Sequence, residues 1–188
     1  MNYLAIWDHA LDHLKQADPA WEQTLSKWQD ERPASKSDRD LMEEYGWVVA
    51  CCGMTAKAIL PRWERLGAAL GHWEPAKAAA TPIQDVLAVL NNRRKITAIQ
   101  DFARDLAQTP GQMARLAALA PKQALAWFGT LPWVGPNNRH HLARNLGWDT
   151  IVTNGPVPRL AAMLEMTSED LCEGIAAETG ERVRTVDL

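Results

Sequence analysis

The residues of this 188-residue sequence that could contact a polyanion are concentrated in one short segment, LPWVGPNNRHH, at residues 131–141. Pro132 fixes its own φ and Gly135 permits a positive φ, so the spacing predicts a tight turn with Pro136 opening the helix that follows. Main-chain N–H groups left unpaired at such a helix start can bind phosphate without reading base sequence. We therefore predict phosphate contacts from Pro132, Trp133, Val134, Gly135, Asn137, Asn138 and Arg139. The alternative is an ordinary corner between two helices.

The charge distribution favours a polyanionic partner more than the net charge of −3 does. Residues 1–90 contain 9 Lys/Arg and 13 Asp/Glu, residues 91–160 contain 9 and 3, and residues 161–188 contain 2 and 7. A basic middle segment creates a local positive potential, and local potential steers phosphate binding. Chance clustering is the alternative explanation.

Other side chains could complete a site for a base and its phosphates. The candidates are aromatic or sulfur-bearing residues for a pocket and basic or amide residues for phosphates: Trp47, Cys52, Met54, Asn92, Arg93, Lys95, Arg144 and Arg159. His141 is a candidate acid–base or phosphate-binding group. Each has a structural alternative, namely core packing for Trp47 and His141, a solvated helix face for the basic cluster, and an ion pair with Asp149 for the two later arginines.

Several classes of protein are not expected. The three cysteines have no CxxC or Cys/His spacing, which argues against a disulfide framework, a zinc site and an iron–sulfur cluster. The N-terminus lacks a basic start followed by a long apolar run, so no signal peptide is predicted. No apolar run reaches 18 residues, so no membrane span is predicted either. These features indicate a reducing, cytoplasmic compartment.

The elements that would position these residues are all helical. Apolar residues at spacings of three and four predict an all-α fold of about nine helices, over residues 2–16, 20–28, 38–52, 55–70, 91–108, 121–128, 159–166 and 168–179, with further short ones. Ser37 or Asp38 is the expected N-cap of the third. We divide the chain into N-terminal helices at 1–36 and one compact unit at 37–188, with a helical hairpin at 121–147.

Four segments resemble the helix-hairpin-helix DNA glycosylase superfamily. They are LPWVGPNNRHHLARNLG at the hairpin, YGWVVACCGM at 45–54, VLNNRRKITAIQDFA at 89–103, and LARNLGWDTIVTNGPVPRLAAML downstream. The resemblance covers roughly residues 40–188, and the hairpin is its most specific part. It implies an all-α fold that binds duplex DNA and flips a base out of the helix.

The sequence departs from this family at the position of the catalytic carboxylate. Where the family carries Lys-Pro-Asp, this chain has Val152, Thr153 and Asn154. Asn154 has the shape of Asp without its charge, and losing one electrostatic stabiliser of the transition state costs about 2–4 kcal/mol. No Lys follows Lys122, which argues against a Schiff-base lyase.

The sequence keeps the DNA-binding hairpin and lacks the catalytic carboxylate, and one branch of the superfamily shows this combination. It comprises phage proteins of thymine hypermodification, described as alpha-glutamyl/putrescinyl thymine pyrophosphorylase-like or amino acid:DNA transferases. This resemblance implies transfer of an amine or amino acid to the 5-methylene carbon of a flipped, phosphorylated 5-hydroxymethyluracil, with Asn154 and His141 as the catalytic candidates. The alternatives are an N-glycosylase that uses Asn, and a non-catalytic DNA-binding module.

The same resemblance sets the expected partners. They are double-stranded DNA and an amino acid or other amine donor. The protein is expected to act as a monomer in the cytoplasm, and if a phage encodes it, in the cytoplasm of the host cell. No cofactor is identified apart from a candidate monovalent cation at the hairpin carbonyls.

Overall fold

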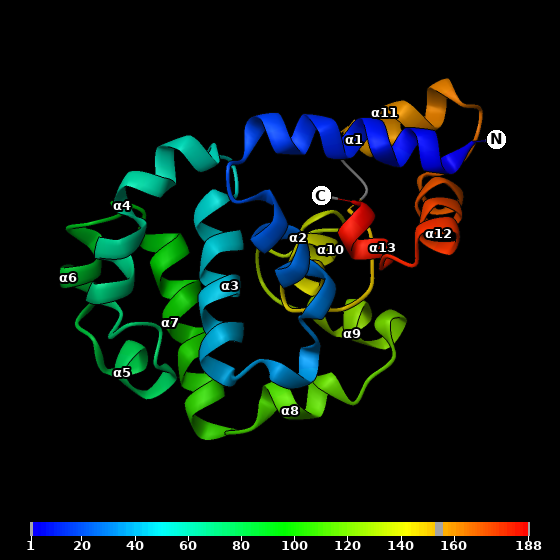
Figure 1. Ribbon diagram of the computed structural model, residues 1–188. Coiled ribbons are helices and arrows are strands. Elements are labelled where there is room, and N and C mark those ends of the chain that lie inside the picture. Colours follow the sequence, from blue (N-terminus) through cyan, green and yellow to red (C-terminus); the bar gives the residue numbers. More distant parts are fainter. Residues whose placement is uncertain (1, 153–155, 188) are drawn as a thin grey trace.

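Helices make up every regular element of residues 2–152 and 156–187, which the computed structural model describes (Figure 1). They are α1 (Tyr3–Ala17), α2 (Trp21–Asp30), the 3₁₀ helix η1 (Pro33–Ser35), α3 (Asp38–Cys51), α4 (Ala56–Ala69), α5 (Pro75–Ala80), α6 (Ile83–Leu87), α7 (Arg93–Gln108), α8 (Gln112–Ala117), α9 (Pro121–Phe128), α10 (Asn138–Asn145), α11 (Pro156–Met163), α12 (Ser168–Thr179) and α13 (Val183–Val186). The predicted all-α class is confirmed. None of the described helices is long and apolar enough to cross a bilayer.

The first hydrophobic core is built around α3 and α7. The side chain of Ser37 accepts a hydrogen bond from the Asp40 amide and so caps α3, as predicted. The predicted apolar stripe of α7 is buried against α3, where the rings of Tyr45 and Phe102 lie 4.3 Å apart. Helices from α3 to α10 contribute to this core, which ends at Trp148.

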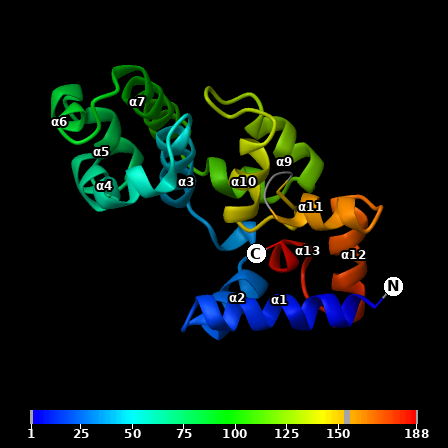
Figure 2. The ribbon, with the colours of Figure 1, turned by 90° about the horizontal axis from the view of Figure 1, so that it is seen from above.

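The second core joins helices from the two ends of the chain. Trp7 of α1 packs with Ala161 of α11 and with Leu171 and Ile175 of α12. Figure 2 shows α1 and α2 alongside α12 and α13, with α3–α7 on the opposite side of the molecule. The helices before residue 37 therefore pack against the C-terminal helices, which cover their apolar face.

Buried polar contacts connect the two cores. Arg184 of α13 is fully buried and donates hydrogen bonds to the backbone carbonyls of Trp28 and Glu31 at 3.1 Å each. Asp187 accepts hydrogen bonds from Arg144 of α10 at 2.8 Å and from the Val152 amide at 2.7 Å. A buried charge is tolerated only when it is paired and hydrogen-bonded, so this arrangement fixes α10 against the C-terminal helices.

At Gly147, just after α10, the backbone lies close against the backbone of Arg32 and Pro33. The φ of Gly147 is 99°, and a Cβ there would lie 2.7 Å from the carbonyl carbon of Arg32. We expect Gly147→Ala to cost about 2–4 kcal/mol of unfolding free energy, because backbone strain and overpacking add. Gly180→Ala is the matched control, since Gly180 also has a positive φ of 77° but its Cβ would meet nothing within 4 Å. Denaturant unfolding measures both, and equal losses would contradict the assigned close approach.

Candidate functional site

The predicted hairpin is present between α9 and α10, but its turn is made differently from the prediction. The positive φ, 68°, belongs to Trp133 and not to Gly135. A Cβ on Gly135 would meet nothing within 4 Å. Gly135 is therefore not required for the turn, and its lack of a side chain instead leaves the backbone accessible from outside.

Some backbone amides of this turn donate hydrogen bonds within the protein, and others do not. Val134 donates its N–H to the Leu131 carbonyl at 3.2 Å, so the expectation that this amide is unpaired was wrong. In the described part of the chain, the amides of Gly135 and Asn138 donate to no protein acceptor. Both residues line a shallow hollow of about 310 Å³ together with Pro136 and Asn137. Two N–H groups at a helix start can bind one phosphate there.

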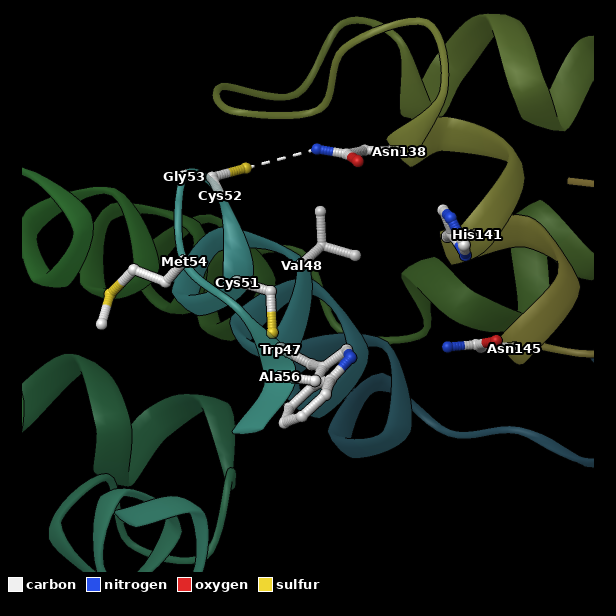
Figure 3. A pocket seen from close by; sticks show the side chains of 10 residues that line it. All are labelled: Trp47, Val48, Cys51, Cys52, Gly53, Met54, Ala56, Asn138, His141 and Asn145. Carbon is white, nitrogen blue, oxygen red and sulfur yellow. Dashed lines mark hydrogen bonds between the residues drawn. The ribbon is translucent and has the colours of Figure 1, made fainter. Parts of the chain in front are cut away.

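Side chains from α3 and α10 hold the tip of the hairpin. Tyr45 donates from Oη to the carbonyl of Pro132 at 3.1 Å. Cys52 donates to the carbonyl of Trp133 at 3.3 Å, and Nδ2 of Asn138 lies 3.3 Å from the Cys52 sulfur and 3.4 Å from the same carbonyl (Figure 3). A cation at these carbonyls, which stays a prediction, would have to compete with these donors.

A hollow of about 450 Å³ opens beside the hairpin, between the C-terminal end of α3 and α10. It is lined by Trp47, Val48, Cys51, Cys52, Gly53, Met54, Ala56, Asn138, His141 and Asn145 (Figure 3). The structure thus brings three of the proposed substrate-binding residues together with His141 and one proposed DNA-binding residue. We call this hollow the base pocket.

The base pocket is weakly charged. Its described lining contains no carboxylate and no lysine. Burial raises the pKa of both Cys51 and Cys52, which favours the protonated thiols over nucleophilic thiolates. Asn154 lies outside the described residues, so its predicted role remains a prediction.

Lys95 and Asn92 have structural contacts in place of the predicted substrate contacts. Lys95 is only 2% exposed, and its Nζ donates to the Ala50 carbonyl at 2.7 Å. The phosphate-binding expectation for Lys95 was wrong, because its side chain points under the end of α3. Asn92 caps α7 by accepting from the Lys95 amide at 3.2 Å. Arg93 is exposed on the first turn of α7 and lines none of the hollows found among the described residues.

The two later arginines also lie away from the base pocket. Arg144 pairs with Asp187 at 2.8 Å, and its guanidinium lies 4.9 Å from the centre of the Trp28 ring. Its predicted role as a phosphate clamp was wrong, because its charge is paired with Asp187 and its guanidinium packs on the Trp28 ring. The predicted alternative partner, Asp149, instead accepts from the Arg184 amide at 2.9 Å. Arg159 is exposed on α11 and lines no hollow of the described residues.

A second, smaller hollow adjoins the base pocket and was not predicted. It has a volume of about 150 Å³ and shares Trp47 and Asn145 with the base pocket. Its other lining residues are Glu43, Glu44 and Trp63. Helical spacing places Glu44 one turn before Trp47, but no sequence pattern connects α3 to Trp63, which comes from α4. We call it the acidic hollow.

Comparisons with known proteins do not assign this chain to a family. No protein-family model, no curated protein and no solved structure matches it. The resemblance to helix-hairpin-helix DNA glycosylases therefore rests on the residues of the sequence segments given above.

The contacts of Cys52 predict a measurable effect on the hairpin. Cys52→Ala removes a donor and an acceptor at the hairpin tip, a loss of about 1 kcal/mol, which corresponds to roughly fivefold faster amide exchange if the tip opens locally. Hydrogen exchange of the amides in 131–138 measures it. Cys51→Ala is the control, because Cys51 also lines the base pocket but has no hydrogen bond to the hairpin. Identical exchange in the two variants would contradict the tethering role of Cys52.

Proposed function

We propose that this protein binds duplex DNA through the hairpin and modifies a flipped base in the base pocket. In the proposed reaction, an amine or amino acid is transferred to the 5-methylene carbon of a phosphorylated 5-hydroxymethyluracil, and the glycosidic bond stays intact. One observation carries this proposal. The base pocket, whose described lining has no carboxylate or lysine, lies directly beside the hairpin, where the Gly135 and Asn138 amides donate to no protein acceptor.

The hairpin supports the DNA-binding part of the proposal. Gly135 and Asn138 offer two amides in a hollow open to solvent, and no side chain stands over Gly135. Trp133 is 40% exposed at the tip of the same turn. The segment 91–160, in which the hairpin lies, carries 9 Lys/Arg against 3 Asp/Glu. These features favour contacts to phosphates rather than to base edges.

The base pocket supports the modification part. Its volume of about 450 Å³ is within the usual range for small-molecule sites. Trp47 and Met54 provide apolar surface for a base, whereas Asn138, His141 and Asn145 provide polar groups for its edge. Enzymes that flip bases use this combination of stacking and edge hydrogen bonds.

The proposed step does not need a carboxylate beneath the sugar. The lone pair of the amine nitrogen forms a bond to the 5-methylene carbon, and the bond from that carbon to the phosphate oxygen breaks with its electron pair. Phosphate leaves, and the nitrogen gives up a proton to a base, for which His141 is the candidate. Base excision would instead develop positive charge on the sugar, which a carboxylate stabilises.

One assay separates the candidate functions. The protein is incubated with duplex DNA that carries phosphorylated 5-hydroxymethyluracil and with a mixture of amines and amino acids, and the DNA is digested to nucleosides for mass spectrometry. An adducted nucleoside is the expected result. Free base with abasic sites would overturn the proposal in favour of base excision, and unchanged DNA with salt-dependent binding would overturn it in favour of a binding module.

The hairpin makes a separate prediction about affinity. Gly135→Ala should leave stability unchanged, because its Cβ meets nothing in the protein, but should weaken duplex binding about tenfold regardless of sequence, because a methyl group blocks the approach of phosphate to the amide. Gly129→Ala is the control in the same hairpin, since its Cβ would be in ordinary contact, at 3.4 Å or more. Fluorescence anisotropy measures both. Equal affinities of the two variants would show that the turn does not contact DNA.

A further inference from the structure

The acidic hollow has the composition of a site for an organic cation. Two carboxylates, Glu43 and Glu44, face it together with the indole rings of Trp47 and Trp63 and the amide of Asn145. Among these described lining residues there is no Lys, Arg or His. Carboxylates combined with aromatic walls are the arrangement that binds ammonium groups, because both attract positive charge.

Glu44 lacks an internal counter-ion. It accepts one hydrogen bond, at 3.0 Å from Nδ2 of Asn145, and forms no ion pair within the described part of the chain. Lys36, in the segment just before α3, is paired with Glu31 at 2.8 Å. Burial raises the pKa of Glu44 against the opposing coulombic effects of Lys36 and Lys27, so these two lysines do not fully compensate its negative charge. A cation bound there would supply the missing charge.

The aromatic wall is held rigidly. The rings of Trp47 and Trp63 are perpendicular, with centroids 5.0 Å apart. Trp63 stacks at 4.6 Å on Trp73, which is buried and packs against Gly46 and Gly67. These ring contacts fix the two indoles where they line the hollow, so a bound cation would meet aromatic groups that need no ordering.

We propose that the acidic hollow binds a primary alkylammonium ion and discriminates against amines that carry an α-carboxylate. The carboxylate of an α-amino acid would face Glu43 and Glu44 with no cationic side chain in the hollow to balance it, and like charges at this distance repel. Trp47 and Asn145 line both hollows, so a cation bound here is adjacent to a base in the base pocket. The role of this cation as the amine donor rests on the proposed function, but its binding does not.

Isothermal titration calorimetry with three matched ligands tests the site without DNA. They are n-butylammonium, norvaline, which is the same amine with an α-carboxylate, and 1-butanol, which is the neutral analogue. We expect n-butylammonium to bind at least tenfold more tightly than either of the others. The indole N–H resonances of Trp47 and Trp63, assigned from Trp→Phe variants, should shift during the same titration.

Glu44→Gln should lower the affinity for n-butylammonium at least tenfold, because it removes the charge and keeps an oxygen that can accept from Asn145. The control is Glu178→Gln, an exposed acidic residue of α12, which should bind as the unmodified protein does. Trp63→Leu provides a second variant, which removes an aromatic group from α4 and leaves the residues of α3 unchanged. Circular dichroism establishes that each variant is folded.

The outcomes distinguish the site from the proposed function. Equal binding of norvaline and n-butylammonium, or unchanged affinity in folded Glu44→Gln and Trp63→Leu, would overturn the site. Glu44-dependent binding by a protein that makes no DNA adduct supports the site and contradicts the proposed function. Adduct formation whose KM for the amine is unaffected by Glu44→Gln retains the function and overturns the assignment of the acidic hollow as the site of the amine donor.

Discussion

The C-terminal end of α3 is the constraint on which the site depends. The last carbonyls of a helix have no partners within that helix, and inside a protein they must be satisfied by other groups. Here Lys95 of α7 donates to the Ala50 carbonyl at 2.7 Å, and its positive charge lies at the negative end of the helix. Two residues later, Cys52 donates a hydrogen bond to the hairpin. This end of α3 therefore fixes both the floor of the base pocket and the tip of the hairpin.

Hydrogen bonds from Cys52 and Asn138 to the hairpin tip stabilise a backbone conformation that is unfavourable for Trp133 on its own. Trp133 has a positive φ of 68°, which costs a bulky residue about 1–3 kcal/mol, and its carbonyl accepts hydrogen bonds from Cys52 and Asn138. The same contacts that offset this strain also leave the indole 40% exposed and the Gly135 amide open. Strain at the tip and accessibility of the backbone thus have a common physical cause.

Local patterns in the sequence account for the helices and the position of the hairpin, whereas the details of its turn and the long-range pairing were predicted wrongly. The periodicity of residues 91–108 predicts α7 and its buried stripe, and Ser37 predicts the start of α3. Short helices such as α5, α8 and α13, with four to six residues each, carry too few positions for a periodic pattern. Nothing local shows that Arg144 meets Asp187, 43 residues later, or that Lys95 turns inward. Trp47 and Met54 line the same hollow because they lie on either side of the end of one helix.

Charge is distributed over three adjacent regions, and each suits one part of a ternary complex. The hairpin offers amide N–H groups, the base pocket offers apolar and neutral polar groups, and the acidic hollow offers carboxylates. Glu44 lines the acidic hollow, where its carboxylate accepts a hydrogen bond from Asn145, a residue that also lines the base pocket. Under the proposed function, a carboxylate held there would attract an ammonium ion beside the base rather than stabilise positive charge on the sugar. The proposal of chemistry on the base, with an amine as the second substrate, uses this separation of charge, whereas cleavage of the glycosidic bond would not.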